Sequence, residues 1–78
     1  RMEWITKDNK LVREFKFKDF THAFAFLTKV AFAAEKQNHH PEIYNVYNKV
    51  IISLQTHDAG NVITEKDHKL AETIDAFV

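Results

Sequence analysis

Three of the five histidines in this 78-residue sequence lie where structural elements are expected to end. His39 and His40 stand at the C-terminal end of a predicted long helix, and His57 follows the second of two predicted hairpins. Glu35 precedes His39 by four residues, so the two side chains share a face if the helix continues that far. A carboxylate beside an imidazole orients the ring and favours its protonated form. The cluster therefore predicts histidine general acid-base chemistry on a small molecule.

Two other interpretations of the histidines remain open at this point. A solitary histidine is more often a surface or structural residue than a catalyst, and this is our interpretation of His22 and His68. Zinc is the second alternative, because three histidines and Glu35 could supply four ligands. Adjacent histidines rarely point at one ion, and the sequence has no cysteine and no H-E-x-x-H motif. We therefore expect no metal site.

Composition limits the remaining classes of function. A chain of 78 residues folds around one core, so we expect a single domain over residues 1–78. Eleven basic and eleven acidic residues give a formal charge of zero, which provides no long-range attraction for nucleic acid or anionic lipid. No apolar run is long enough to span a membrane, and the absence of cysteine fits a reducing compartment. We expect a soluble, cytoplasmic protein with no direct binding of nucleic acid or membrane.

The first element that must support these histidines is a hairpin. The stretch from Glu3 to Phe17 predicts two strands around a turn at Asp8-Asn9-Lys10, because Asn and Asp tolerate the left-handed backbone of tight turns. Arg13 is the exception on an otherwise apolar face. That face contains Met2, Trp4, Leu11, Phe15 and Phe17.

A long helix is predicted next, with Asp19 as its N-cap and its end near Asn38. Pro41 disfavours helical backbone at His40, so the helix must end by His39. The main apolar stripe consists of Phe20, Ala23, Phe24, Leu27, Val30, Ala31 and Ala34, and three further apolar residues, Phe26, Phe32 and Ala33, fall outside it. A helix that is apolar on two sides has either a wide core face or a second partner.

The second half of the chain repeats the pattern. Residues Ile43 to Thr56 predict a second hairpin with a break at Asn48-Lys49, although one continuous strand is an alternative. A loop over residues 58–61 precedes a final helix, which Thr64 and Asp67 open as a capping box. The order β-β-α-β-β-α predicts an α+β fold, with a four-stranded antiparallel sheet and the helices on one face.

The spacing of the candidate residues resembles the signature of the pterin-4a-carbinolamine dehydratases. The matching positions are Glu35, His39, His40, Pro41, Tyr47, His57 and Asp67, and the phrases Phe15-Lys16-Phe17-Lys18-Asp19-Phe20, Asn45-Val46-Tyr47-Asn48-Lys49-Val50 and Thr56-His57-Asp58 are also similar to animal-type members. The similarity extends from about Leu11 to the C-terminus. It implies an enzyme, without metal or cofactor, that dehydrates a 4a-hydroxy-tetrahydropterin to the quinonoid dihydropterin and so recycles the cofactor of aromatic amino acid hydroxylases.

The same resemblance implies roles for individual residues. His39, His40 and His57 are the expected catalytic group, with His57 and His39 exchanging the acid and base roles and His40 positioning the pterin ring. The expected substrate-binding residues are Glu35, Pro41, Thr56, Asp58 and Ala59. Family members usually have an additional N-terminal helix, and we expect this chain, which begins almost on the first strand, to lack it.

A second activity implied by the resemblance belongs to another class. Animal members bind the dimerisation domain of a homeodomain transcription factor through the long helix and act as coactivators, which would add a nuclear location. Phe26, Phe32 and neighbouring alanines could support this contact or simply form a homo-oligomer, dimer or tetramer, through the long helix and the sheet edge. An RNA-binding α+β domain is disfavoured, because the formal charge is zero and the sequence has no recognisable basic-aromatic strand motif for phosphates or stacked bases.

Overall fold

The computed structural model describes residues 3–78 and contains the predicted series of elements. In chain order they are β1 (Ile5–Lys7), β2 (Lys10–Lys16), α1 (Phe20–Gln37), β3 (Glu42–Val46), β4 (Lys49–Leu54), a 3-10 turn η1 (His57–Ala59) and α2 (Glu65–Asp75). The order β-β-α-β-β-α is confirmed, and η1 is an addition to it. No helix within residues 3–78 is both long and apolar enough to cross a bilayer. The predicted position of Met2 lies outside the described residues.

The four strands form one antiparallel sheet in the order β1-β2-β4-β3. The first hairpin turns at Asp8 and Asn9, both with positive φ (52° and 61°), as a tight two-residue turn requires. The second turns at Tyr47 and Asn48, one residue before the predicted break. This displacement shifts the strand pairing by two residues, and because side chains alternate along a strand, the residues that share a face are the same for either turn.

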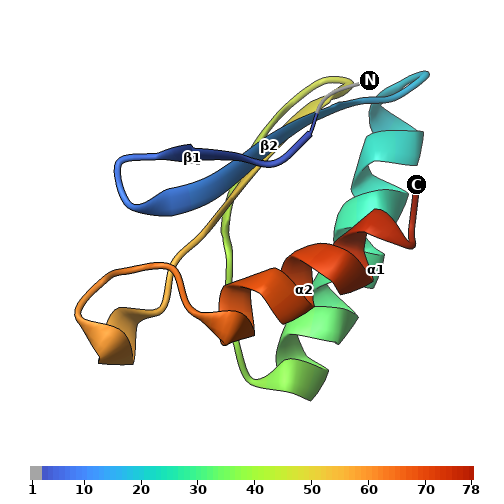
Figure 1. Cartoon of the computed structure of the whole chain (residues 1–78). Helices are drawn as coiled ribbons and strands as arrows, with labels where there is room; N and C mark the ends of the chain where they lie inside the picture. The colour runs from blue at the N-terminus through green and yellow to red at the C-terminus, as the bar shows by residue number, and fades with distance from the viewer. Residues whose placement is uncertain (1–2) are drawn as a thin grey trace.

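Both helices cover the same face of the sheet, as predicted (Figure 1). The central strands β2 and β4 alternate between buried and partly exposed side chains, whereas β1 and β3 at the edges are mostly exposed. The core is formed by apolar residues of four elements: Leu11 and Phe15 on β2, Val50, Ile52 and Leu54 on β4, Ala23, Phe26, Leu27, Val30 and Ala33 on α1, and Leu70, Ala71 and Ile74 on α2. The C-terminus lies on the opposite side of the molecule from η1 (Figure 1).

The buried face of α1 differs from the predicted stripe. Phe26 and Ala33, predicted to lie outside the stripe, are buried, and the Phe26 ring lies 4.8 Å from that of Phe15. Phe20 and Phe24, predicted to be core residues, are about half exposed. The stripe was wrong because α1 is apolar around most of its circumference, so sequence spacing alone does not select the buried side. Phe32 is 74% exposed.

Arg13, the exception on the apolar face of β2, is buried and has an acidic partner. Its guanidinium NH1 donates to Asp75 Oδ1 at 2.5 Å, and the Trp4 indole donates to the same oxygen at 2.8 Å. The Arg13 guanidinium also lies 4.5 Å from the centre of the Phe15 ring. These contacts connect the first hairpin to the C-terminal end of α2, so the buried charge is compensated.

Candidate active site

The C-terminal end of α1 separates the two adjacent histidines. Asn38 ends the helix in the left-handed conformation (φ +50°), and its backbone N–H donates to Ala34 and Glu35 carbonyls. The backbone N–H of His39 also donates a hydrogen bond to the Ala34 carbonyl, at 3.0 Å. The chain leaves the helix axis at this point, with His39 buried and the next residue, His40, exposed. The two side chains consequently have different partners.

His39 contacts a buried carboxylate. Its Nε2 lies 2.5 Å from Oδ1 of Asp67, which is completely buried. The second carboxylate oxygen, Oδ2, accepts hydrogen bonds from the Thr56 hydroxyl at 2.7 Å and the Thr64 backbone N–H at 2.8 Å. Burial acts to raise the pKa of Asp67, but the hydrogen bonds from His39, Thr64 and Thr56 outweigh it and hold the pKa below its ordinary value. Asp67 is thus a buried carboxylate at neutral pH.

Asp67 also forms the predicted capping box of α2. The Thr64 hydroxyl accepts the Lys66 backbone N–H, while the Asp67 side chain accepts the Thr64 backbone N–H. One carboxylate therefore both starts α2 and contacts His39 from α1. The sequence predicted the first of these roles and missed the second.

His40 is the partner of Glu35, in contrast to the predicted pairing of Glu35 with His39. His40 Nε2 lies 2.6 Å from Glu35 Oε1, across five residues of sequence. The prediction was wrong because the left-handed Asn38 ends the helical spacing before His39. The side chains of His40 and Glu35 are 60% and 78% exposed, so this pair is open to solvent.

His57 begins η1, which Gln55 and Thr56 connect to the end of β4. The turn that follows has positive φ at Gly60 (+88°) and Asn61 (+60°), and a bridge from the Thr56 N–H to the Val62 carbonyl closes it. His57 Nδ1 lies 3.1 Å from the amide oxygen of Asn61. His57 is exposed, and the Asn61 amide that it contacts is neutral and at the long end of hydrogen-bond range.

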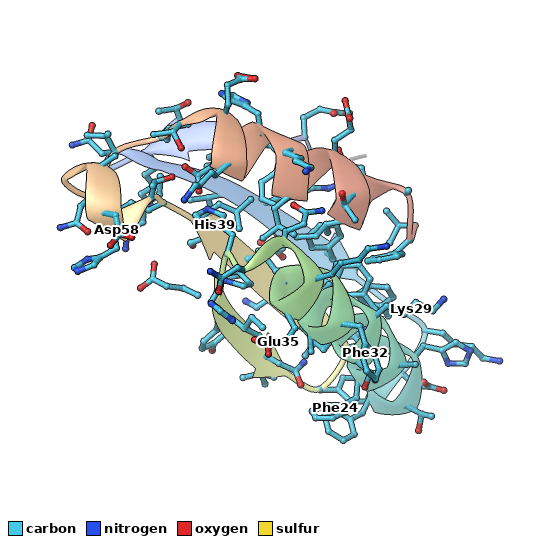
Figure 2. The ribbon with its side chains drawn as sticks, turned by 90° about the horizontal axis from the view of Figure 1, so that it is seen from below. Phe24, Lys29, Phe32, Glu35, His39 and Asp58 are labelled. Atoms are coloured by element: carbon cyan, nitrogen blue, oxygen red, sulfur yellow. The ribbon has the colours of Figure 1, made fainter. Side chains whose placement is uncertain are left out.

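These segments enclose a cleft of about 290 Å³ between the end of α1, η1 and the start of α2 (Figure 2). Its lining residues are Asn38, His39, His40, Gln55, Thr56, His57, Asp58 and Lys66. Five of the predicted site residues, the three histidines with Thr56 and Asp58, are among them. Glu35, Pro41 and Ala59 do not line the cleft, and Glu35 reaches it only through His40.

Three residues of the cleft were missed in the sequence. Asn38 and Gln55 adjoin predicted residues, and only their position in the chain could have indicated them. Lys66 could have been found, because it immediately precedes Asp67 in a recognised capping box at the start of α2. Lys66 lines the cleft together with Asp58 and the three histidines.

The arrangement suits proton transfer. Three imidazoles, one buried and two exposed, approach a single small cleft from two segments of the chain, and each lies within hydrogen-bond distance of a polar side chain. Within residues 3–78, no three His, Cys, Asp or Glu side chains converge as a metal ion would require. A larger groove of about 770 Å³ runs between α1 and α2, but its lining has no histidine or carboxylate.

The fold, an antiparallel sheet covered by two helices on one face, is shared with a solved pterin dehydratase structure. A solved structure described as a transcriptional coactivator/pterin dehydratase from Brucella melitensis matches 95% of this chain and 80% of its own, with a TM-score of 0.90 and 45% identity.

The family model described as pterin 4 alpha carbinolamine dehydratase matches residues 1–77, and the chain belongs to this family. A relative from Solibacter usitatus, which carries the name pterin-4-alpha-carbinolamine dehydratase provisionally, is 55% identical over 77 residues, covering 99% of this chain and 80% of its own. A further solved structure shares 26% identity with a TM-score of 0.77, covering 97% of this chain and 87% of its own. It is described as a pterin dehydratase-like protein that is a RuBisCO assembly factor in the alpha-carboxysome.

Proposed function

We propose that the chain is a 4a-hydroxytetrahydrobiopterin dehydratase that works by histidine general acid-base catalysis. The observation that carries the proposal is the cleft itself, where His39, His40 and His57 line one small space together with Thr56 and Asp58. The family membership supplies the substrate class, a 4a-hydroxy-tetrahydropterin. Its bicyclic ring is neutral, so recognition depends on shape and hydrogen bonds rather than on net charge, in agreement with a formal charge of zero.

The reaction requires two proton transfers and no covalent intermediate. One imidazole protonates the 4a-hydroxyl as the C4a–O bond breaks, and water leaves. A second imidazole accepts the proton from N5, and the N5–H electron pair becomes the new bond between N5 and C4a. We assign these two roles to His57 and His39, with His40 positioning the pterin. Acid-base assistance of this kind contributes about 10² to 10⁴-fold.

The substrate-binding part of the proposal includes Thr56 and Asp58 in the cleft wall, with Pro41 and Ala59 next to lining residues in the chain. Glu35 acts through its contact with His40. In the cell we propose a cytoplasmic role, in which the enzyme returns spent pterin to aromatic amino acid hydroxylases.

The decisive experiment compares His57→Ala with His68→Ala. His68 is exposed on α2 and does not line the cleft, so its variant controls for the general effect of removing an imidazole. Dehydratase turnover is followed by the loss of the 4a-hydroxypterin absorbance, and circular dichroism verifies the fold. We expect His57→Ala to lose at least about 10²-fold in kcat and His68→Ala to keep wild-type turnover. Wild-type turnover in His57→Ala would contradict the site assignment.

A second candidate function is supported by the outer face of α1. Phe20, Phe24 and Phe32 are between 49% and 74% exposed, and Phe24 and Phe32 line an apolar hollow with Ile43 of the edge strand β3 (Figure 2). Exposed apolar surface of this kind indicates a contact with another protein. We propose first a homo-oligomer through α1 and the sheet edge, and second a coactivator-type contact with a transcription factor's dimerisation domain, which would require a nuclear location.

Self-association is tested with Phe32→Glu, a change on the exposed face that leaves the core untouched. We expect sedimentation to show a lower oligomer and the fold to persist, whereas an unchanged mass would argue against this face as the contact. In a pull-down, a partner of different sequence that competes with self-association would favour the interaction role.

A further inference from the structure

The hydrogens around Asp67 can be assigned one by one. An ionised carboxylate only accepts hydrogen bonds, so each of its three neighbours must donate. The Thr64 backbone N–H and the Thr56 hydroxyl both donate to Oδ2. Because the Thr56 hydroxyl has given its only hydrogen to Asp67, the 2.6 Å contact between the two threonine hydroxyls must be a donation from Thr64 to Thr56. The hydrogen bonds of this network therefore all run from donor to acceptor in the direction of the Asp67 carboxylate.

The same reasoning fixes the ring of His39. Its Nε2 lies 2.5 Å from Oδ1 and must carry a hydrogen, which leaves Nδ1 as the lone-pair nitrogen of the neutral imidazole. The buried, unpartnered side-chain atoms of residues 3–78 are Arg13 Nε and Gln37 Oε1, so Nδ1 is not among them. Nδ1 is the nitrogen left for a molecule in the cleft that His39 lines.

The other two imidazoles of the cleft are not fixed in this way. His40 contacts a carboxylate, but both side chains are mostly exposed, so water competes with the contact. His57 is also exposed and contacts the side-chain amide of Asn61. An amide can accept a hydrogen bond through its oxygen or donate one through its nitrogen, so it does not select one tautomer of the ring. Of the three rings, His39 alone has a buried anion that imposes one tautomer.

We infer that Asp67 is a positioning residue that holds His39 in the Nε2–H tautomer and so makes Nδ1 the acceptor of the pterin N5 proton. This inference rests on the proposed dehydratase function and completes its assignment of roles. The N5 proton moves to Nδ1, the N5–H electron pair forms the bond to C4a, and the hydroxyl leaves as water with a proton from His57. The resulting imidazolium is paired with the Asp67 carboxylate, which remains ionised.

The variant Asp67→Asn tests the inference with almost no change of shape. The Thr64 N–H and Thr56 hydroxyl at Oδ2 select the amide oxygen for that position, so the amide nitrogen faces His39. A donor then meets Nε2, and the neutral ring must move its hydrogen to Nδ1 to accept it. The proton acceptor is lost although the side chain stays in place, and the corresponding change in catalytic triads lowers kcat about 10⁴-fold.

The measurement is the ¹⁵N spectrum of the His39 side chain in the whole chain, at a pH where the ring is neutral. The two tautomers have distinct nitrogen shifts, and a His39→Gln variant assigns the signals. Thr64→Ala is the matched control, because it removes the hydroxyl that caps α2 but leaves the Asp67 carboxylate opposite His39. We expect an Nε2–H ring in the wild type and in Thr64→Ala, and an Nδ1–H ring in Asp67→Asn.

Each result has one meaning. The expected tautomers, together with a fall of at least about 10²-fold in kcat for Asp67→Asn, support the inference. A wild-type His39 with hydrogen on Nδ1 would overturn it without any variant, and so would a folded Asp67→Asn that keeps its turnover. If the tautomers are as expected but the wild type does not dehydrate 4a-hydroxy-tetrahydropterin, the Asp67–His39 assignment stands and the proposed function fails.

Discussion

Removal of Asp75 should leave a buried positive charge without its partner. The Arg13 side chain is 6% exposed and that of Asp75 is 33% exposed. In Asp75→Ala, the Arg13 guanidinium and the Trp4 indole both lose their acceptor, while the Nε of Arg13 is already buried without one. Breaking a buried ion pair from one side costs about 3–5 kcal/mol.

The lower end of that range applies here, because Asp75 is one-third exposed and water can reach the space it leaves. We therefore expect the free energy of unfolding to fall by about 3 kcal/mol. Trp4 is the sole tryptophan of the chain and lies against Asp75, so its fluorescence during urea unfolding reports the change directly. Glu72→Ala is the control, an exposed acid on the same helix, and should stay within about 0.5 kcal/mol of wild type.

A double variant separates the charge from the packing. In Arg13→Met with Asp75→Ala, no buried charge remains, so most of the lost stability should return. The His39 tautomer should be the same in all of these proteins, since Asp75 lies at the opposite end of α2 from Asp67. A loss below about 1 kcal/mol in Asp75→Ala would refute the view that this pair compensates Arg13.

Two further predictions concern the carboxylates of the site. Folding lowers the pKa of Asp67, so the stability that its carboxylate contributes is present above the pKa of the unfolded chain and is lost as the pH falls through the folded value. The urea midpoint of the wild type should therefore fall between neutral pH and about pH 3. The midpoint of Asp67→Asn should fall less steeply over the same range. Glu35→Gln should change the free energy of unfolding by less than about 0.5 kcal/mol, because the pair with His40 is exposed, and a larger loss in chemical denaturation would contradict this.

Much of the fold could be predicted because local signals agreed with one another. Asp8 and Asn9 have the side chains that a left-handed turn tolerates, Asp19 caps α1, and Thr64 opens α2. Each of these signals acts over three or four residues and needs no knowledge of the tertiary structure. The sheet order β1-β2-β4-β3, in contrast, depends on how the two hairpins meet, and no local pattern contains that information.

The errors have a common physical origin in tertiary packing. Phe24 and Phe26 are equally apolar, and only the positions of the sheet and α2 decide that Phe26 is buried. Similarly, the contact between His39 and Asp67 joins residues 28 positions apart, which helical spacing cannot reveal. Helical spacing predicted a contact between Glu35 and His39 because it assumed a regular helix through Asn38.

Asn38 explains how two histidines adjacent in sequence come to be unlike. Had α1 continued through this position, His39 and His40 would lie about 100° apart on one helix, at similar depth in the molecule. The left-handed residue turns the chain instead, so that His39 enters the protein beside a buried carboxylate and His40 remains in solvent beside Glu35. A neutral ring beside a buried anion favours one tautomer and can return to it after each turnover, while an exposed ring can rotate and exchange protons with water. The pair is therefore better suited to divided roles, one fixed acceptor and one adaptable contact, than to shared ligation of a metal.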